Sequence, residues 1–514
     1  MTTESPERDG VVVATRPTPG DPRPYDFPTV EHQRLRNGLT VFMVDMPGRP
    51  LISATLVVPV GAADEPATDA GAAVLAARAM TEGTERYDAV ALTEAAERLG
   101  ASIHAESGWD ATSVGVDVPA TRLGQALDLL AEVLLRPTFP ENEIDRLRDE
   151  RLNDLLQAQA DPRRRADETF IGTIYASESP YHRPAAGTRD TVEGLGREAA
   201  RRAYRRILDP DRATLVVAGE LGGQDVVSIA DGLLGAWERD PDASPVSPVL
   251  DRAAAGGRIV RVVHRPGSVQ TEIRIGHPGL PRRIPDYHAV SVMSAILGGL
   301  FNSRLNMQLR EAKGYTYGAG AGFDLRRAAG PFTARAAVNT DVTVPAVIDT
   351  LTELDRMRTS PVEAAELAAA RDFLIGVFPL RFETAGAVAG AIAGLAVHGL
   401  GLDQLTGYRR RIEAVDVDAV AAAARDHLLV DRAAIVLVGD VDAFGTALEG
   451  AGLGRLVIDR DDAPGPQLTE GEPAVTVGPT DEDDTSGPTA GAEEPSLPGS
   501  EETEPGHALD GEGA

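Results

Sequence analysis

The chain repeats one pattern twice, with the two copies about 220 residues apart. An apolar run that ends in glycine and an acid occurs at residues 211–220 and again at residues 431–440. Further pairs with offsets of 219 to 221 are 47–48 with 266–267, 126–130 with 347–351, and Pro140 with Pro361. Offsets this uniform indicate a duplication. A solenoid would need more copies, so we expect two domains of about 210 residues each.

Each copy mixes the periodicities of strands and helices. In the first copy, apolar residues alternate or run continuously in four segments that we expect to be strands, 39–46, 51–60, 101–106 and 111–118. They recur at helical spacing in four others, 68–80, 89–98, 121–135 and 141–159. This order predicts an α+β fold of two duplicated α/β sandwich domains, in which helices cover a mainly antiparallel sheet.

Composition divides the chain further. We expect a flexible N-terminal segment at 1–29, a first domain at 30–238, a Pro-rich linker at 239–257 and a second domain at 258–460. Residues 461–514 contain 15 Asp or Glu and no Lys or Arg, which predicts a disordered, solubilising acidic tail. The tail carries 15 of the 29 net negative charges.

The net charge and the lack of cysteine exclude several classes of function. A charge of −29 disfavours binding to nucleic acid or to an anionic membrane. With no cysteine, the chain can form no disulfide, thiolate metal site or cysteine nucleophile. The N-terminus has no basic start followed by an apolar run, and no apolar stretch reaches the length of a membrane span. We therefore expect a cytoplasmic protein.

Several short motifs resemble the insulinase/pitrilysin zinc peptidases, in their mitochondrial-processing-peptidase branch. They are 37–41 (NGLTV), 61–66 (GAADEP), 70–71 (AG), 82–84 (EGT), 99–102 (LGAS), 136–139 (RPTF), 161–162 (DP), 179–181 (SPY) and 302–305 (NSRL). The resemblance covers about residues 30–455. It implies a fold like that of LuxS and the processing peptidases, which agrees with the duplication.

The family's metal site is altered in this sequence. Active members carry H-x-x-E-H on the helix before the Gly83-Thr84 pair, with two zinc ligands on one helical face, a Glu that activates water, and a distant third ligand. The resemblance places Val74, Ala77 and Arg78 at the motif positions and Asp154 at the distant ligand position. Leu147 stands where a supporting Glu is expected. We expect no metal in this chain and an acid paired with Arg78.

No other local zinc motif is visible. Among the nine histidines, no pair has the i, i+3 or i, i+4 spacing that would put two ligands on one helical face. A site assembled from distant residues, such as His104 with Asp154, is the remaining route to a metal.

The second copy contains a segment that the family uses for substrate. Residues 304–317 (RLNMQLREAKGYTY) resemble the R-L-x-x-x-L-R-E-x-x-G-x-x-Y segment of metal-free subunits. The resemblance assigns substrate binding to Arg310 and Tyr317, whose donors suit peptide carbonyl groups. The other interpretation makes Arg310 a surface residue paired with an acid and Tyr317 a half-buried aromatic.

The leading hypothesis is a non-catalytic subunit of a heterodimeric peptidase, inactive alone. It would form half of a peptide-binding chamber, bind unfolded peptide, and rely on a zinc-bearing H-x-x-E-H partner of the same family. The resemblance also implies that an edge strand at 101–107 pairs with the peptide. The alternative is a non-enzymatic, homo-oligomeric scaffold or peptide-binding protein with the same fold.

Overall fold

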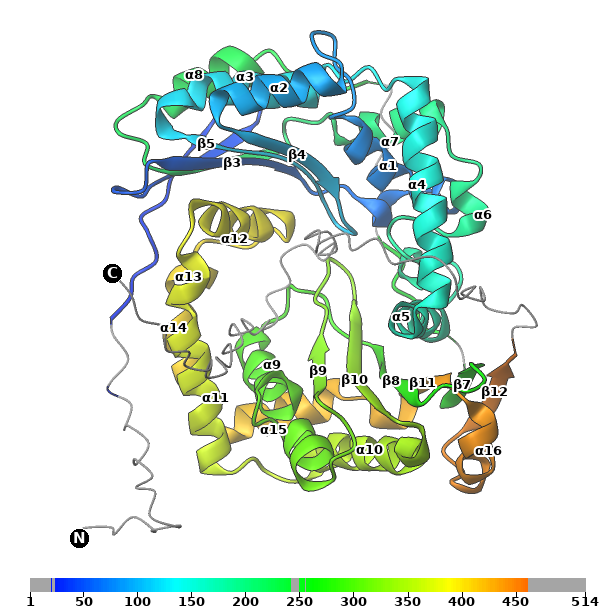
Figure 1. The fold of residues 1–514 in the computed structure, drawn as a ribbon. Helices are drawn as coiled ribbons and strands as arrows, with labels where there is room; N and C mark the ends of the chain where they lie inside the picture. Colours follow the sequence, from blue (N-terminus) through cyan, green and yellow to red (C-terminus); the bar gives the residue numbers. More distant parts are fainter. Residues whose placement is uncertain (1–19, 21–23, 242–248, 255, 461–514) are drawn as a thin grey trace, which may run out of the picture.

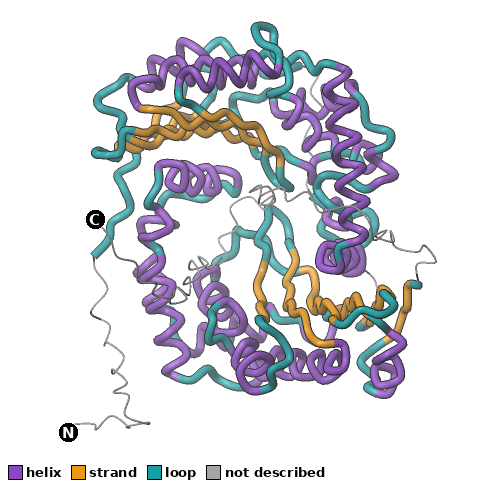
Figure 2. Tube along the Cα trace, viewed as in Figure 1, coloured by secondary structure: helices purple, strands orange, loops and turns teal. Residues whose placement is uncertain are grey.

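The computed structural model describes residues 20, 24–241, 249–254 and 256–460. The predicted acidic tail at 461–514 and most of the N-terminal segment lie outside these residues. The described chain forms two layered α+β halves that face each other, as Figures 1 and 2 show. The predicted fold class is confirmed.

Each half contains one six-stranded sheet. The first has the order β1-β2-β6-β3-β5-β4 and the second the order β12-β7-β11-β8-β10-β9. The strands of the first sheet are β1 (Glu31–Arg34), β2 (Thr40–Asp45), β3 (Leu51–Val58), β4 (Ser102–Ser107), β5 (Thr112–Pro119) and β6 (Thr214–Gly219). Those of the second are β7 (Ile259–His264), β8 (Gln270–Pro278), β9 (Ala319–Phe323), β10 (Pro331–Asn339), β11 (Ala434–Gly439) and β12 (Arg455–Asp459).

The register repeats the duplication residue by residue. Val41 on β2 is paired in parallel with Leu215 on β6, and Val260 on β7 is paired in parallel with Ile435 on β11. The other neighbours of β6 and β11 are antiparallel, so each sheet has the same mixed pattern at its centre. The halves differ at one edge, where β1 is antiparallel to β2 and β12 is parallel to β7.

The helices of the first half begin with α1, and the longest of them is α4, with 20 residues. They are α1 (Ala72–Ala79), α2 (Ala89–Leu99), α3 (Leu123–Leu135), α4 (Glu141–Ala160), α5 (Pro162–Ile174), α6 (Arg189–Val192), α7 (Arg197–Ile207) and α8 (Val226–Leu234). The predicted helix 68–80 is shorter than expected, because residues 67–69 form a separate 3₁₀ turn and Gly71 takes the left-handed conformation at φ +100°.

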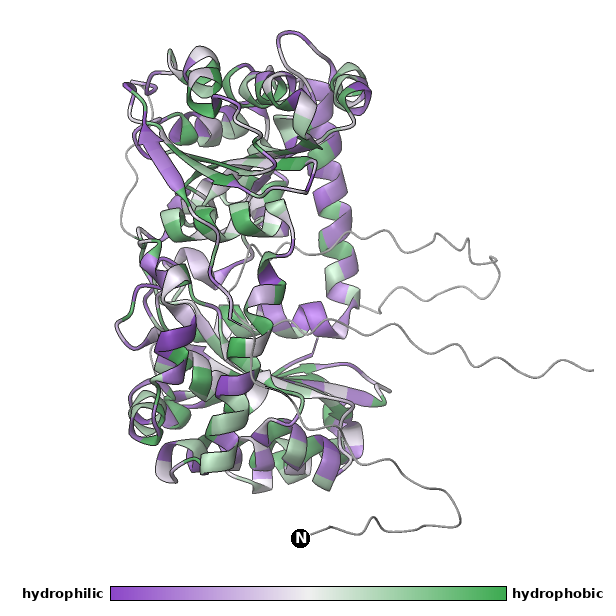
Figure 3. Ribbon diagram, turned by 90° about the vertical axis from the view of Figure 1, so that its left-hand side faces the viewer, coloured by the Kyte–Doolittle hydropathy of each residue, from purple (hydrophilic) through white to green (hydrophobic). Residues whose placement is uncertain are grey.

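The second half also contributes eight helices among the described residues. They are α9 (Tyr287–Ser294), α10 (Thr343–Thr359), α11 (Ala364–Val377), α12 (Ala385–Val397), α13 (Asp403–Thr406), α14 (Tyr408–Glu413), α15 (Val417–His427) and α16 (Val441–Gly450). Two π-helical segments, Ala295–Gly299 and Asn306–Ala312, precede β9. Apolar residues concentrate in the sheets and on the helix faces against them (Figure 3).

The halves exchange one helix each. α12 packs on β3 and β6 of the first sheet, and α5 packs on β8 and β11 of the second (Figure 1). Because each central strand is covered on both faces, β6 and β11 are buried along their whole length, and their sequences are continuous apolar runs. Arg274 on β8 is 2% exposed and bonds Asp167 of α5 at 2.5 Å, so a buried charge also joins the halves.

Two segments with predicted flexibility have ordered parts. Residues 24–29 belong to the predicted flexible segment, yet Phe27 is buried and packs edge-on against Phe382 with ring centroids 5.0 Å apart. In the predicted linker, Ala253 forms a β-bridge with Tyr175. Aromatic packing orders the first segment and backbone pairing the second, and neither is visible in local composition.

No single helix among the described residues is long and apolar enough to cross a membrane. The consecutive segments Ala364–Phe382 and Ala385–Val397 meet that test only when joined across a bend of 112°.

Candidate functional site: an altered metal position, Arg310 with Tyr317, and two free edges

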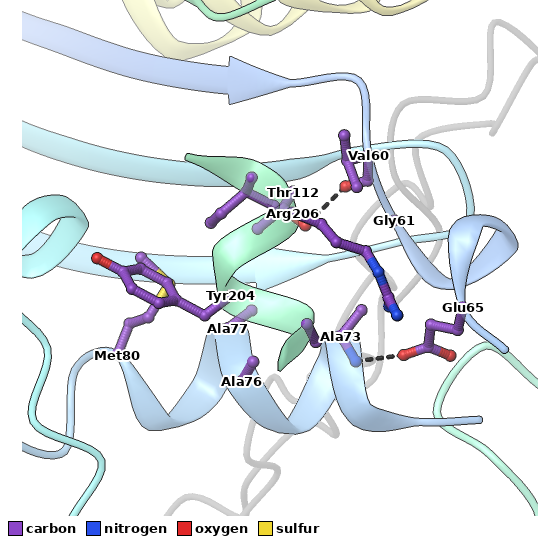
Figure 4. A pocket seen from close by; sticks show the side chains of 12 residues that line it. Val60, Gly61, Glu65, Ala73, Ala76, Ala77, Met80, Thr112, Tyr204 and Arg206 are labelled. Carbon is purple, nitrogen blue, oxygen red and sulfur yellow. Dashed lines mark hydrogen bonds between the residues drawn. The ribbon is translucent and has the colours of Figure 1, made fainter. Parts of the chain in front are cut away.

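The altered metal positions lie on α1 and on the facing helix α4. Val74 and Arg78, one helical turn apart, line a cavity of about 30 Å³ together with Leu147 and Arg151 of α4. Ala77 faces the other side of α1, in a smaller cavity lined by Glu65 and residues of α7 (Figure 4). The structure thus brings Val74, Arg78 and Leu147 together, as the motif requires, with apolar and cationic side chains.

Asp154, at the distant ligand position, is held by two arginines. Arg164 of α5 binds both of its oxygens, with Nη1 2.7 Å from Oδ1 and Nη2 2.9 Å from Oδ2. Arg151 donates to the same carboxylate and also to the carbonyl oxygen of Ala186 at 3.1 Å. Burial acts to raise the pKa of Asp154, but the two arginines outweigh it and hold the pKa below its usual value.

Arg78 has the acidic partner that the sequence led us to expect. Its Nη2 lies 3.0 Å from Glu150 Oε2, and Glu150 also accepts from Arg146 at 2.5 Å. Half of the Arg78 side chain is exposed, so the pair is a surface ion pair.

These residues do not fit a zinc ion. Val and Ala have no lone pair, Arg78 is a donor only, and the one carboxylate is engaged by two guanidinium groups. Zinc sites need three or four lone-pair donors at about 2.0 to 2.3 Å. A cation at Asp154 would also meet two positive charges, so the family's metal position in this chain is both without ligands and electrostatically unfavourable.

Glu65 is a buried acid at the start of α1, and the sequence did not single it out as a functional residue. Its carboxylate accepts the N–H of Ala73 (Figure 4) and that of Gly71 at 3.0 Å, so it caps the helix. Burial raises the pKa of Glu65 to about 7, although these N–H groups and nearby arginines act in the opposite direction. The only sequence signal is its place in the 61–66 motif.

One group of three side chains in the described part of the chain has the donor spacing of a metal site, and it includes neither His104 nor Asp154. His264, Asp440 and Asp442 place their ligand atoms within 4.8 Å of one another. His264 Nδ1 accepts the N–H of Val441 at 3.3 Å, and Arg460 Nη2 lies 2.6 Å from Asp442. Because these contacts occupy the donors, we interpret the group as an ion-pair network.

Arg310 and Tyr317 lie in the second half, on either side of the turn that leads into β9. Arg310 is on the π-helical segment Asn306–Ala312, with its guanidinium 4.3 Å from the Phe301 ring centroid and its Nε 3.6 Å from Glu311. Tyr317 is 94% exposed, which is more than the half-buried alternative expected. π-helical segments such as the one that carries Arg310 are frequent at functional sites.

The structure describes no hydrogen bond or ion pair between these two residues and the altered metal positions of the first half. Instead, Asn306 makes hydrogen bonds within the part of the chain that surrounds Arg310 and Tyr317. Its Nδ2 donates to the Leu300 carbonyl at 3.2 Å, and its Oδ1 accepts the N–H of Ala319 at 2.8 Å.

At one end of each sheet, the last strand has a neighbour on one side only, so its other edge is free. In the first sheet this strand lies beside α1, and in the second it directly follows the segment that contains Arg310 and Tyr317. β4 pairs only with β5, and β9 pairs only with β10. β4 is the edge strand that the sequence placed at 101–107, and α1 packs beside it. β9 has the sequence AGAGF, so its first four residues carry no side chain larger than a methyl group. Free edges of this kind accept an additional strand.

Comparisons with known proteins agree with this geometry. The family model described as Insulinase (Peptidase family M16) matches residues 40–188, and the one described as Peptidase M16 inactive domain matches residues 194–374. An uncharacterized zinc protease of Streptomyces coelicolor is 27% identical over 56% of this chain and 63% of its own length. An uncharacterized zinc protease of Mycobacterium tuberculosis is 25% identical over 82% of this chain and 96% of its own length.

Two solved structures have the same fold. A peptidase M16 inactive domain from Pseudomonas fluorescens has a TM-score of 0.73 and 24% identity, covering 80% of this chain and 98% of that one. A protease from Helicobacter pylori has a TM-score of 0.74 and 19% identity, covering 81% of this chain and 100% of that one.

Proposed function

Because this chain belongs to the insulinase (M16) peptidase family, we propose that it is the metal-free subunit of a two-chain peptidase. A partner chain of the same family would carry H-x-x-E-H, bind the zinc ion and supply the metal chemistry of peptide hydrolysis. This chain would contribute half of the peptide-binding chamber. Its substrate would be an unfolded peptide, because only an extended backbone can add to a sheet edge.

The observation that carries the proposal is the Arg151–Asp154–Arg164 network. A subunit that had simply lost one ligand would retain the others, whereas here the remaining carboxylate is neutralised by two arginines. The fold around it is retained, with α1 beside the free edge β4. A retained fold around a position that does not suit zinc is what the proposed metal-free subunit requires.

Arg310 and Tyr317 are the residues through which this chain would act on substrate. Arg310 is two-thirds buried, and its planar guanidinium is orientated by the Phe301 ring, which leaves N–H groups for peptide carbonyl oxygens. The Tyr317 hydroxyl is exposed and can donate one hydrogen bond to a carbonyl near the bond that the partner cleaves.

The test is reconstitution with the zinc-bearing partner. The purified chain should contain no stoichiometric zinc and should not cleave peptides, and mixing it with the partner should produce chelator-sensitive cleavage. Arg310→Ala and Tyr317→Phe should each lower kcat/KM of the mixture by roughly 10²-fold, the usual effect of losing an orientated donor. Arg98→Ala, at an exposed ion pair on α2, is the matched control and should change nothing.

Three results would contradict the proposal in different ways. One tightly bound zinc per chain, with chelator-sensitive cleavage by the chain alone, would show an active peptidase. Full activity of both variants in the mixture would remove Arg310 and Tyr317 from the site. A stable homo-oligomer that binds peptide and is unaffected by any H-x-x-E-H chain would favour the scaffold alternative.

A further inference from the structure

The tips of the two edge hairpins meet where the halves join. Residues 108–111 connect β4 to β5, and residues 324–330 connect β9 to β10 (Figure 1). These loops occupy equivalent places in the duplicated halves. The N–H of Arg327 donates to Asp110 Oδ2 at 2.7 Å, and the Arg326 guanidinium lies 4.6 Å from the Trp109 ring centroid.

The Arg327 side chain continues into the first half. Its Nη2 donates to Asp64 Oδ2 at 2.7 Å and its Nη1 to the Pro59 carbonyl at 3.0 Å. The Asp64 side chain is completely buried and accepts the N–H of Gly61 at 2.9 Å. Arg327 therefore binds the segment that leads from β3 to α1 as well as the β4–β5 turn.

The backbone at this junction has no spare room. A Cβ at Gly61 would lie 2.5 Å from the Gly108 carbonyl oxygen, and the N–H of Ala62 donates to that oxygen at 3.0 Å. The β4–β5 turn is therefore packed directly on the segment that Arg327 binds. A change in the position of Arg327 would move both.

Two tyrosines of the first half hold the rest of the β9–β10 loop. Tyr175 donates to the Ala329 carbonyl at 2.8 Å, and the Tyr181 hydroxyl accepts the N–H of Ala328 at 3.5 Å while it donates to Asp110 Oδ1 at 3.1 Å. Arg326 lies against the Tyr181 ring at 4.6 Å and pairs with Asp324 at 2.6 Å. The junction is a specific, buried contact that joins the loop to two separate elements of the first half.

We propose that Arg327 is a positioning residue that aligns the free edges β4 and β9, so that one extended peptide can pair with both. This inference rests on the proposed peptide-binding function. β4 ends at Ser107 and β9 at Phe323, immediately before the joined loops, so both strands run toward the junction. A peptide that crosses it pairs parallel with one strand and antiparallel with the other.

The lengths of the strands set the class of peptide. β4 has six residues and β9 has five, so a peptide must exceed about eleven residues to engage both. Shorter peptides can pair with only one of the two edge strands. A fixed alignment makes the second edge available at high effective concentration, and loss of alignment removes that gain for long peptides alone.

The first experiment measures the alignment without peptide. The chain has no cysteine, so Val90→Cys on α2 and Ile348→Cys on α10 introduce two unique, exposed spin-label sites, one in each half. Double electron–electron resonance on the full-length protein should give a narrow distance distribution. Arg327→Ala should broaden it, while Arg335→Ala, at an exposed position of the same hairpin, should leave it narrow.

The second experiment measures binding of two fluorescein-labelled, unstructured peptides of the same composition, one of 24 and one of 7 residues. Arg327→Ala should raise the dissociation constant of the long peptide by at least about tenfold and leave that of the short peptide unchanged. Arg327→Lys, which keeps the charge but cannot reach all three acceptors, should give an intermediate loss. If Arg327→Ala does not fold, Asp110→Ala serves in both experiments, because it removes the carboxylate that accepts from Arg327 and Tyr181 and leaves the Arg327 contacts with Asp64 and Pro59 in place.

The outcomes separate this inference from the function on which it rests. A distance distribution that stays narrow in Arg327→Ala refutes the alignment role whatever the peptides do. An equal loss of affinity for the long and the short peptide also refutes the alignment role, because a general structural role of Arg327 would affect the binding of both. If the wild-type chain binds neither peptide, the peptide-binding function fails and the inference fails with it, even where the distribution broadens.

Discussion

Restoring the three residues of the metal motif should not restore zinc binding while Arg164 is present. The perturbation is Val74→His, Ala77→Glu and Arg78→His, which supplies both nitrogen ligands and leaves Asp154 as the oxygen ligand. Val74 and Arg78 already line one cavity with Arg151 of the facing helix α4, and Arg151 binds Asp154. The remaining obstacle is the charge of the arginines that bind Asp154.

The electrostatic repulsion between a zinc ion and Arg164 can be calculated from one distance. Arg164 Nη1 lies 2.7 Å from Asp154 Oδ1. A zinc ion bound to that oxygen would lie about 2 Å from it, and thus at most roughly 5 Å from the guanidinium nitrogen. At that separation a double and a single positive charge repel by about 7 kcal/mol with an effective dielectric constant near 20. This corresponds to about 10⁵-fold in the dissociation constant.

The measured effect should be smaller than this limit. The Arg164 side chain is about one-third exposed, so it can turn toward water when zinc binds. We expect Arg164→Gln, added to the three substitutions, to tighten zinc binding by at least about 100-fold. Arg163→Gln, at the exposed neighbouring position of α5, should have no effect.

The assay is competition with a chromogenic zinc chelator, with zinc content per chain measured after dialysis. The reasoning is refuted if the three-residue variant binds one zinc as tightly as the variant that also lacks Arg164. It is equally refuted if the Arg163→Gln control tightens binding as much as Arg164→Gln does.

Three further predictions concern stability. Because the folded-state pKa of Glu65 is raised to about 7 from an ordinary 4.5, the folded state binds this proton more tightly, and stability is lost as pH rises from about 4.5 through 7. Glu65→Gln should remove up to about 3 kcal/mol of that pH dependence, measured as urea midpoints at pH 5 and 8. Gly61→Ala should lower the urea midpoint, because its Cβ would meet only backbone atoms, whereas Gly124→Ala, with open space in α3, should raise it slightly. Arg274→Ala should cost about 3 kcal/mol in denaturant titrations by leaving the mostly buried Glu272 carboxylate without its partner, and an unchanged midpoint would contradict a stabilising role for that ion pair.

The fold was accessible from the sequence because its signals are local or repeated. The run at 214–219 is almost entirely apolar because β6 is covered on both faces. In β4, exposed and partly buried side chains alternate, because only one face of this edge strand is covered. The repeat offsets then required a second copy, and the paired registers of β2–β6 and β7–β11 have the same offsets. The altered metal-motif positions could be assigned because they lie at known distances along the chain from two recognisable motifs, Gly83-Thr84 and Asp161-Pro162.

The sequence could not show how distant charges pair. Arg164 and Asp154 are ten residues apart across a helix break, and nothing local indicates that the arginine binds both carboxylate oxygens. The exchange of α5 and α12 between halves was also invisible, because a helix's apolar face does not specify which sheet it covers. Phe27 was assigned to a flexible segment because its partner, Phe382, lies far along the chain.

The sequence by itself determined the duplication, the α+β class and the identity of the side chains at the altered motif positions, because periodicity, repeats and side-chain chemistry are properties of residues and their spacing. Only the tertiary structure decided what replaces the metal and how the two free edges are related. Arg327 contacts Asp64 and Asp110 across more than 200 positions, and such a contact exists only after both halves have folded and packed. Side-chain pairing at that distance depends on the exchanged helices and the joined loops, which no local pattern encodes.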